Sequence, residues 1–384
     1  MHLFISAGEP SGDLHGANLI RALKARDSGI RISGFGGDRM EAAGASLLYA
    51  LCRLSVMWFG SVIAHIATFF RLARQAKQHF LTERPDAVIL IDYPGFHFAL
   101  AKRAHEAGIP VYFFVPPQLW GWAGWRVKKV RRWFTGVLTA LPFEEKWYRE
   151  QGVKTHYVGH PYFDELAAQR LDESFLAEQR AKPGRVVALL PGSRNQEVAK
   201  NFKTILRAAS RIHTERPDVR FLVASFNEHQ AAAAKKMAAR FDLPIEFHVG
   251  RTPEIIELAE MCVSVSGSVS LELMYRLKPT VILYKASWLV GMLGTLFLMM
   301  VKYITLVNLL ADDEVFPEYP TMIDRSREIA GHIVKWLNDP VALAERVERL
   351  RVLKDNIARP GACDRAAAFL VESIKDRSAN RAAA

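Results

Sequence analysis

The feature that most constrains this fold is an alternation, repeated twice, of short apolar runs with longer amphipathic stretches. In the first half, runs of strand length lie near residues 2–7, 31–35, 87–92, 110–115, 136–140 and 155–158. After the polar segment 165–184, further runs lie at 186–190, 219–224, 245–249, 262–265 and 280–284. This alternation is typical of βαβ units, which form a parallel sheet with helices on both faces. The sequence therefore predicts an α/β fold with two Rossmann-like, doubly wound domains.

The length of 384 residues also exceeds what a single hydrophobic core usually reaches. We place the first domain at residues 1–165 and the second at 166–330. Residues 331–384 are expected to form surface helices that pack back on the domains or on a partner subunit. Because open α/β sheets bind ligands at the carboxyl ends of their strands, we expect the domains to face each other across a cleft that holds the site.

Composition excludes several classes of protein. Half of the residues are hydrophobic and 24% are charged, which excludes a disordered chain. The three cysteines lack metal-ligand spacing, and they predict neither a zinc site nor a disulfide scaffold. Without a signal-peptide pattern at the start, we expect a cytoplasmic protein. The net charge of +11 favours an anionic partner, which could be a nucleotide, a phospholipid headgroup or nucleic acid.

The segment 286–301 breaks the soluble pattern. It has sixteen residues without a charge, contains Trp288, and is flanked by Lys285 and Lys302. A spanning helix needs about 20 apolar residues, so we favour a helix that dips into the membrane interface while its lysines meet anionic headgroups. A buried helix, at a core or an oligomer interface, and a true span are the alternatives.

The clearest phosphate signal opens the second domain. The apolar run 186–190 leads into Pro191-Gly192-Ser193-Arg194, and a helix is expected to begin near Asn195. Backbone amides at a helix amino end can hold an anion, and an arginine adds a bidentate contact. We therefore predict a diphosphate site here.

A second loop, 264–272, places Glu272 in the first turns of a helix. There the carboxylate could bind a ribose diol, or could simply pair with the helix dipole.

In the first domain, polar groups follow two apolar runs. The turn 8–17 follows the first run, and Ser11 can cap the helix after it. Asp92 ends a buried run, where its carboxylate, near His97 or Asp13, could take a proton from an attacking hydroxyl. The alternative for Asp92 is a helix cap, and the sequence leaves open which of the three groups is the base.

Residues 116–133 contain four of the eight tryptophans and five basic residues. Aromatic faces with cations suit acyl chains, sugars or a membrane surface, and nucleic acid uses the same groups. A solvated basic helical face is the alternative.

Taken in order, these motifs resemble one family, the lipid-A-disaccharide synthases, which are inverting glycosyltransferases of the GT-B type. The matching segments are 7–13, 34–37, 54–57, 92–94, 117–122, 141–144, 158–161, 190–194, 266–267, 271–272, 308–310 and 317–318. The resemblance implies transfer of diacylglucosamine from UDP-2,3-diacylglucosamine to the 6-hydroxyl of 2,3-diacylglucosamine 1-phosphate. The products would be UDP and a β-1,6 disaccharide 1-phosphate. It implies no cofactor, no metal and no nucleic acid, a site at the inner face of the cytoplasmic membrane, and leaves a homodimer open.

The resemblance also implies roles for individual residues. The expected catalytic groups are Asp92 and Arg194, with Asp13 and His97 beside them. The nucleotide-binding residues would be Gly192, Ser193, Arg194, Ser266, Gly267, Ser268, Glu272 and Asn308. The acceptor-binding or membrane-facing residues would be Glu9, Ser11, Gln118, Trp120, Trp122, Arg126 and Trp288.

The chain departs from the family pattern mostly in its first half. The departures include His15, Ser61, Gly95, His97, Pro116, Ala123, Ser268 and Thr321. Two alternative functions follow. The chain could be a UDP-sugar glycosyltransferase with another lipid acceptor, or a membrane-surface binding paralogue without turnover.

Overall fold

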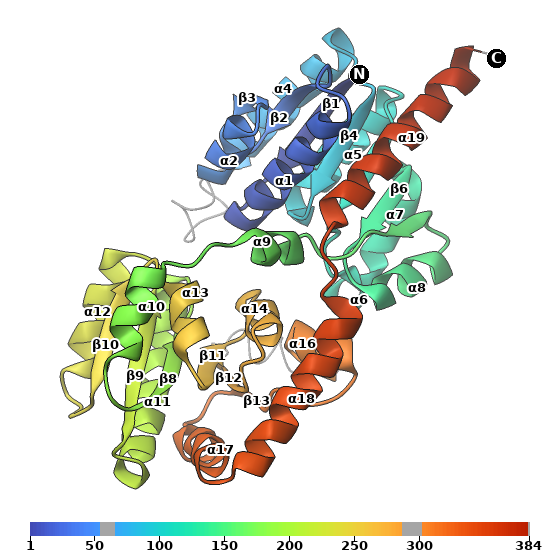
Figure 1. Ribbon diagram of the computed structural model, residues 1–384. Coiled ribbons are helices and arrows are strands. Elements are labelled where there is room, and N and C mark those ends of the chain that lie inside the picture. The colour runs from blue at the N-terminus through green and yellow to red at the C-terminus, as the bar shows by residue number, and fades with distance from the viewer. Residues whose placement is uncertain (54–65, 286–301, 383–384) are drawn as a thin grey trace. The chain divides into compact units, whose positions relative to one another are not determined.

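The computed structural model describes residues 1–53, 66–285 and 302–382. It has two compact units, one formed by residues 1–167 with 359–384 and the other by 168–358 (Figure 1). Each unit contains one parallel sheet with helices around it, which confirms the predicted α/β class. The cleft between the two domains stays a prediction, and each unit is described by itself below.

The sheet of the first unit has seven strands in the order β3-β2-β1-β4-β5-β6-β7. The strands are β1 (His2–Ala7), β2 (Arg31–Phe35), β3 (Ser46–Tyr49), β4 (Ala87–Ile91), β5 (Val111–Phe114), β6 (Gly136–Thr139) and β7 (Thr155–Tyr157). The helices of this unit are α1 (Pro10–Arg26), α2 (Asp38–Ala42), α4 (Ile66–Thr82), α5 (Pro94–Glu106), α6 (Leu119–Trp122), α7 (Val127–Trp133), α8 (Pro142–Glu150) and α19 (Ala362–Ala382). Helix α9 (Tyr162–Ala168) leads into the second unit. The order reverses between β1 and β4, and such a switch point is where open α/β sheets bind ligands.

The second unit has a six-stranded sheet in the order β10-β9-β8-β11-β12-β13. The strands are β8 (Arg185–Leu190), β9 (Val219–Ser225), β10 (Ile245–Val249), β11 (Met261–Val265), β12 (Thr280–Lys285) and β13 (Glu318–Thr321). The helices are α10 (Glu173–Arg180), α11 (Asn195–Glu215), α12 (Glu228–Ala238), α13 (Thr252–Leu258), α14 (Val269–Tyr275), α16 (Leu306–Ala311), α17 (Ser326–Asn338) and α18 (Pro340–Ile357). Here the switch point lies between β8 and β11.

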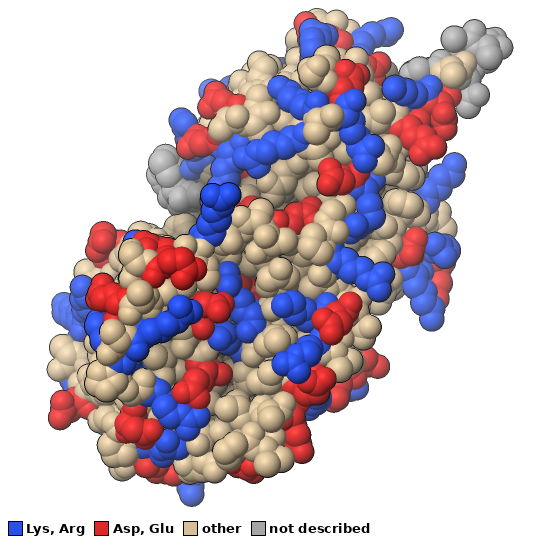
Figure 2. All heavy atoms as spheres, in the orientation of Figure 1, with Lys and Arg blue, Asp and Glu red and all other residues tan. Residues whose placement is uncertain are grey.

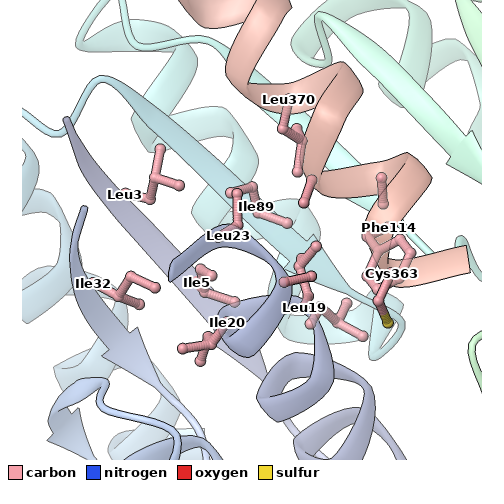
Figure 3. Close-up of a cluster of buried hydrophobic side chains, with 14 of the residues drawn as sticks. Leu3, Ile5, Leu19, Ile20, Leu23, Ile32, Ile89, Phe114, Cys363 and Leu370 are labelled. Atoms are coloured by element: carbon pink, nitrogen blue, oxygen red, sulfur yellow. The ribbon is translucent and has the colours of Figure 1, made fainter. Parts of the chain in front are cut away.

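Continuous apolar runs become central strands because both faces of a parallel sheet are covered. All five residues of β4 are buried, and so are all seven of β9. On one face of the first sheet, Leu3 and Ile89 pack with Leu19 and Leu23 of α1 and with Leu370 of α19 (Figure 3). The last helix of the chain therefore completes the core of the first unit.

The C-terminal segment 331–384 is helical and packs on the two units, and part of it is buried in their cores. Ile329, Ile333 and Trp336 of α17 are buried in the core of the second unit. The expected group is also divided, because α17 and α18 belong to the second unit while α19 packs on α1 in the first. Apolar residues at three- and four-residue spacing bury a stripe of each helix, which their Ala- and Arg-rich composition conceals.

Candidate active site

A pocket of about 230 Å³ opens at the switch point of the second unit. Its walls come from the loops after β8, β9 and β11 and from the start of α13. The lining residues are Leu190, Gly192, Ser193, Arg194, Glu197, Ala224, Phe226, Thr252, Val265, Ser266, Gly267, Ser268 and Val269. The pocket therefore brings together six of the residues that the sequence predicts to bind a nucleotide.

The loop between β8 and α11 has the geometry of an anion site. Gly192 has a φ of +114°, and a Cβ atom there would lie 2.5 Å from Oε2 of Glu197, so this turn requires glycine. Helix α11 begins at Asn195, as predicted, with Arg194 at its N-cap position. Its 21 residues direct the positive end of the helix dipole at the pocket.

Arg194 is half exposed and lies over this helix start. Its Nη1 donates to Oε1 of Glu197 at 3.2 Å, and its backbone N–H donates to Oε2 of the same residue at 3.2 Å. An exposed ion pair of this kind contributes about 0–1 kcal/mol, so a diphosphate can compete for the guanidinium at small cost. Arg194 thus lines the pocket beside the amino end of α11.

Two of the predicted nucleotide-binding residues have structural partners instead. Glu272 is buried in α14 and accepts a hydrogen bond from Nε of Arg276 at 3.0 Å. In the part of the chain that the structure describes, the residues lining the pocket do not include Glu272. The Arg276 guanidinium also donates to Glu257 at 2.9 Å and to Gln169 at 2.7 Å. Glu272 is therefore placed to hold α14 in the core of the unit.

Asn308 is the second of these residues, and it is fully buried. Its Nδ2 donates to the carbonyl of Phe316 at 2.7 Å and to Oε1 of Glu318 at 2.8 Å, while its Oδ1 accepts from the Phe316 amide at 2.8 Å. Glu318 also accepts from the amides of Ile304 at 2.7 Å and Thr305 at 2.8 Å. This network fastens α16 to the start of β13.

In the first unit, Asp92 ends β4 at the switch point, as predicted. Asp92 and Tyr93 have φ values of +48° and +51°, and Val115, whose carbonyl accepts from the Asp92 amide at 3.2 Å, has +51°. Left-handed backbone at three neighbouring non-glycine residues is strained, and such strain is concentrated at functional sites. The turn makes the Asp92 carboxyl group a candidate for chemistry.

Burial, together with the negative charge of Glu9, raises the pKa of Asp92 to about 6. A carboxylate is a better proton acceptor when its pKa lies near the operating pH. Asp92 is still mostly ionised at pH 7, so it has both the charge state and the basicity that a general base requires.

His97 holds this turn rather than acting as a base. It is fully buried in α5, and its Nδ1 donates to the Asp92 carbonyl at 2.7 Å. Burial lowers the pKa of His97 to about 4, so the ring is neutral and its Nε2 accepts from the Ser6 hydroxyl at 2.9 Å. Both ring nitrogens are occupied within the protein.

Asp13 has a structural partner as well. Its carboxylate accepts from the amides of Gly37 at 2.8 Å, Arg39 at 3.1 Å and Met40 at 3.1 Å. The side chain therefore caps the amino end of α2 from a buried position in α1. Of the three groups left open by the sequence, the geometry favours Asp92 as the base.

The loop after β1 differs from the prediction in one detail. The N-cap residue of α1 is Glu9, and no side chain caps the helix, so Ser11 is not the cap but an exposed residue within the first turn. Glu9 lies beside the Tyr93 ring in the lining of the groove described below.

The Trp-rich segment begins after β5, close to Asp92. Trp120 donates from Nε1 to Oε1 of Glu144 at 3.0 Å, and Gln118 is exposed at the N-cap position of α6. Arg126 lies 5.0 Å from the centre of the Trp125 ring, which is 64% exposed. Trp122 lies in α6, and its side chain is outside the described atoms.

A groove of about 640 Å³ runs between α4 and α5 beside the Asp92 turn. Its walls are largely apolar and its two charged residues are Glu9 and Arg103. The lining residues are Glu9, Ile66, Phe69, Phe70, Ala73, Tyr93, Pro94, Gly95, Phe96, Ala99 and Arg103. Phe70 is 66% exposed, which is typical of a surface that meets an apolar partner.

Three features of the sequence analysis lie outside the described residues: the segment 286–301 with Trp288, the family-matching segment 54–57, and the family departure at Ser61. Among the helices that the structure does describe, none is both long enough and apolar enough to cross a bilayer.

Sequence reasoning missed several residues of these sites. Glu144 is 1% exposed, and burial raises its pKa to about 7 while the neighbouring Asp92 charge adds to the shift. Its signal was the helix start at Leu141-Pro142, where a glutamate at the third position accepts from the Leu141 amide at 3.2 Å. Phe226 and Gln230 carry no motif, and only their place after β9 identifies them.

Solved structures of other proteins have a similar fold. A UDP-N-acetylglucosamine 2-epimerase from Listeria monocytogenes, described as putative, matches with a TM-score of 0.67 and 12% identity, over 99% of this chain and 97% of that chain. MurG of Acinetobacter baumannii matches with a TM-score of 0.60 and 12% identity, over 97% and 99%. At these identities the likeness shows the fold, which is the two-Rossmann-domain architecture shared by GT-B glycosyltransferases and such epimerases.

The sequence comparisons go further. The model of the lipid-A-disaccharide synthetase family matches residues 3–356. Lipid-A-disaccharide synthases of Syntrophus aciditrophicus and Geobacter sulfurreducens are 35% and 32% identical over 376 and 373 residues; each match covers 97% of this chain, with 98% and 97% of the relatives. The chain belongs to the lipid-A-disaccharide synthase family.

Proposed function

We propose that this chain transfers diacylglucosamine from UDP-2,3-diacylglucosamine to the 6-hydroxyl of 2,3-diacylglucosamine 1-phosphate, with inversion at the anomeric carbon. The observation that carries the proposal is the chemistry at the two switch points. One presents a strained aspartate with a raised pKa, and the other a cationic loop at a helix amino end. Membership of the family supplies the substrates.

The proposed reaction is a single displacement. Asp92 accepts the proton of the acceptor 6-hydroxyl, whose oxygen forms a bond to the anomeric carbon of the donor. The bond from that carbon to the diphosphate breaks, and UDP leaves with the electron pair. Arg194 and the amino end of α11 stabilise the negative charge that develops on the diphosphate. Because these groups supply positive charge, we propose that the reaction needs no metal.

The groove between α4 and α5 supports an acylated acceptor. It adjoins the Asp92 turn through Tyr93 and Pro94, and most of its surface is apolar. An acyl chain in this groove would bring its sugar to the Asp92 edge, while Arg103 could meet an anionic group at the rim.

We further propose that the protein works at the inner face of the cytoplasmic membrane. The exposed Trp125 lies next to Arg126 and within 5.9 Å of Lys129, and α7 carries further exposed basic residues. Tryptophan and lysine or arginine are the residues that favour the headgroup region of an anionic bilayer.

A second candidate is transfer to a different lipid acceptor, and one position favours it. Gly95 stands where the family usually has aspartate, and it lines the groove with no atom within 4 Å of a Cβ built there. The groove is therefore more open and less acidic at this point than the family pattern implies.

The test is an assay of the purified protein in detergent micelles. UDP-diacylglucosamine and radiolabelled diacylglucosamine 1-phosphate should give the disaccharide phosphate, and Asp92→Ala should abolish product while UDP affinity is retained. Arg194→Ala should weaken both. UDP binding without product would contradict the proposed acceptor, and product from other acylated acceptors would then support the second candidate. Equal UDP affinity in Arg194→Ala would contradict its role.

A further inference from the structure

An exposed aromatic side chain stands in the pocket of the second unit. Phe226 is 62% exposed at the carboxyl end of β9, and it lines the pocket together with Ser193 and Arg194. Most phenylalanines in this fold are buried, because exposing an aromatic ring to water forfeits the free energy gained on burial. An aromatic ring that stays exposed beside an anion-binding loop therefore indicates that a planar, apolar group binds against it.

A buried glutamine connects this ring to the anion-binding loop. Gln230 is 3% exposed in the first turn of α12. Its Nε2 donates to the carbonyl of Ser193 at 2.7 Å, and its Oε1 accepts from the backbone N–H of Phe226 at 3.2 Å. Asn227 caps α12 by accepting from the Gln230 amide at 2.9 Å, which fixes the helix that carries the glutamine. One side chain thus sets the spacing between two walls of the pocket.

We propose that Phe226 is the aromatic platform on which the nucleobase of the donor stacks, and that Gln230 is a positioning residue that holds this platform in register with the diphosphate loop. The proposal rests on the proposed nucleotide-sugar site and extends it by assigning the base-binding wall. A nucleotide carries both a flat base and a diphosphate, and the pocket has a separate wall that suits each of them.

The strength of base stacking determines how much affinity the loss of Phe226 should cost. Every base has a π face, so a phenylalanine contributes affinity without distinguishing one base from another. Loss of such a platform is worth about 1–3 kcal/mol per base, which corresponds to a roughly 5- to 150-fold weaker affinity. Inorganic diphosphate has no base, and its affinity should not depend on Phe226.

Calorimetric titration of the full chain with UDP, uridine and inorganic diphosphate tests the platform. Phe226→Ala should weaken the affinity for UDP and for uridine by about the same factor, roughly 5- to 150-fold, and leave the affinity for diphosphate unchanged. Phe226→Tyr should restore UDP affinity. Ile323→Ala, at another exposed apolar residue of the same unit, is the matched control and should change none of the three.

Gln230→Glu tests the positioning role. The glutamate can still accept from the Phe226 amide but cannot donate to Ser193, so diphosphate affinity should fall while uridine affinity is retained.

Phe226→Trp offers a readout of the platform that is independent of affinity, because stacking should change the fluorescence of the new tryptophan with UDP and not with diphosphate.

Each contrary result has a distinct meaning. Equal weakening of UDP and diphosphate in Phe226→Ala would show a disturbed loop and overturn the platform. Unchanged UDP affinity in Phe226→Ala, while Arg194→Ala weakens it, would overturn the platform and leave the nucleotide site intact. Failure of the unmodified protein to bind UDP would overturn the proposed function itself.

Discussion

At the residue scale, the first unit concentrates unfavourable features around one carboxyl group. Asp92 lies in left-handed backbone, is partly buried, and has Glu9 as a like-charged neighbour. His97 and Val115 hold the backbone of this turn through the Asp92 carbonyl and amide. The surrounding structure therefore sustains a conformation and a pKa that an isolated aspartate would not adopt.

The influence of Glu9 on Asp92 can be measured through the pH dependence of activity. The Glu9 charge raises the pKa of Asp92, so Glu9→Gln should lower that pKa from about 6. If Asp92 must be ionised to act as the base, the acidic limb of kcat/KM should move to lower pH in this variant. Glu41→Gln, at an exposed position on α2, is the control and should leave the limb in place. An acidic limb that stays near pH 6 in Glu9→Gln would exclude this coupling.

The raised pKa of Asp92 also predicts an effect on stability. A folded-state pKa of about 6, against an ordinary value of 3.8, means that ionisation opposes folding. The stability that the protonated Asp92 carboxyl group gives to the folded state is fully present below pH 3.8 and is lost as the pH rises through 6. Asp92→Asn should therefore gain about 1–2 kcal/mol in free energy of unfolding at pH 8 relative to pH 4. Urea unfolding at the two pH values measures this, and an equal effect at both would refute it.

At the element scale, the central strands of the two sheets could be predicted from the sequence, and two edge strands could not. β4 and β9 are continuous apolar runs because helices cover both faces of their sheets. β3 has only four residues, and β13 contains Pro320, so neither has an apolar run that would distinguish it from a loop.

The candidate sites were predictable where the signal lay in the backbone. Gly192 and Arg194 follow a strand and precede a helix, and that order alone predicts their place in the lining of the pocket at the start of α11. Glu272, Asn308 and Asp13 are polar residues of the same motifs, yet they turn inward to hold α14, α16 and α2. Sequence pattern does not reveal whether a polar side chain points to a ligand or to its own backbone, because both uses require the same hydrogen-bonding groups.

The hydrogen-bond network around Asn308 should contribute measurably to the free energy of unfolding of the protein. Asn308→Ala leaves the Phe316 carbonyl and amide without their buried partner, at a cost of about 2–4 kcal/mol. Urea unfolding should show this loss of stability. UDP affinity should fall only as far as the loss of folded protein explains. Asn356→Ala, on the exposed face of α18, is the control and should change stability by about 0.5 kcal/mol or less. Normal stability with weakened UDP binding would instead make Asn308 a direct ligand.

At the scale of the whole molecule, the net charge is positive, and its distribution can be followed on one face. The chain carries +11, and Figure 2 shows lysine and arginine interspersed with aspartate and glutamate over the face in view. A nucleic-acid-binding protein usually presents a continuous basic stripe, so this face does not favour that partner.

The two units differ in how the chain builds them. Residues 168–358 are continuous and contain their own core, whereas the first unit needs both ends of the chain. We expect a fragment of residues 168–358 to fold and to bind UDP, as measured by circular dichroism and calorimetry. A fragment of residues 1–167 would expose Leu19 and Leu23 on α1 and should not show a cooperative thermal transition. Cooperative unfolding of that fragment would contradict the requirement for α19.

The position of α19 has a consequence for synthesis on the ribosome. Leu370 and Ile374 cover the first sheet but follow the whole second unit in the chain, and Asp164 holds the start of their helix through the amides of Gly361 and Cys363. Because domains fold as they emerge, the second unit can finish while the first still waits for its final helix. Residues 1–167 are therefore synthesised before the second unit, but their core is completed only after it, when α19 covers α1.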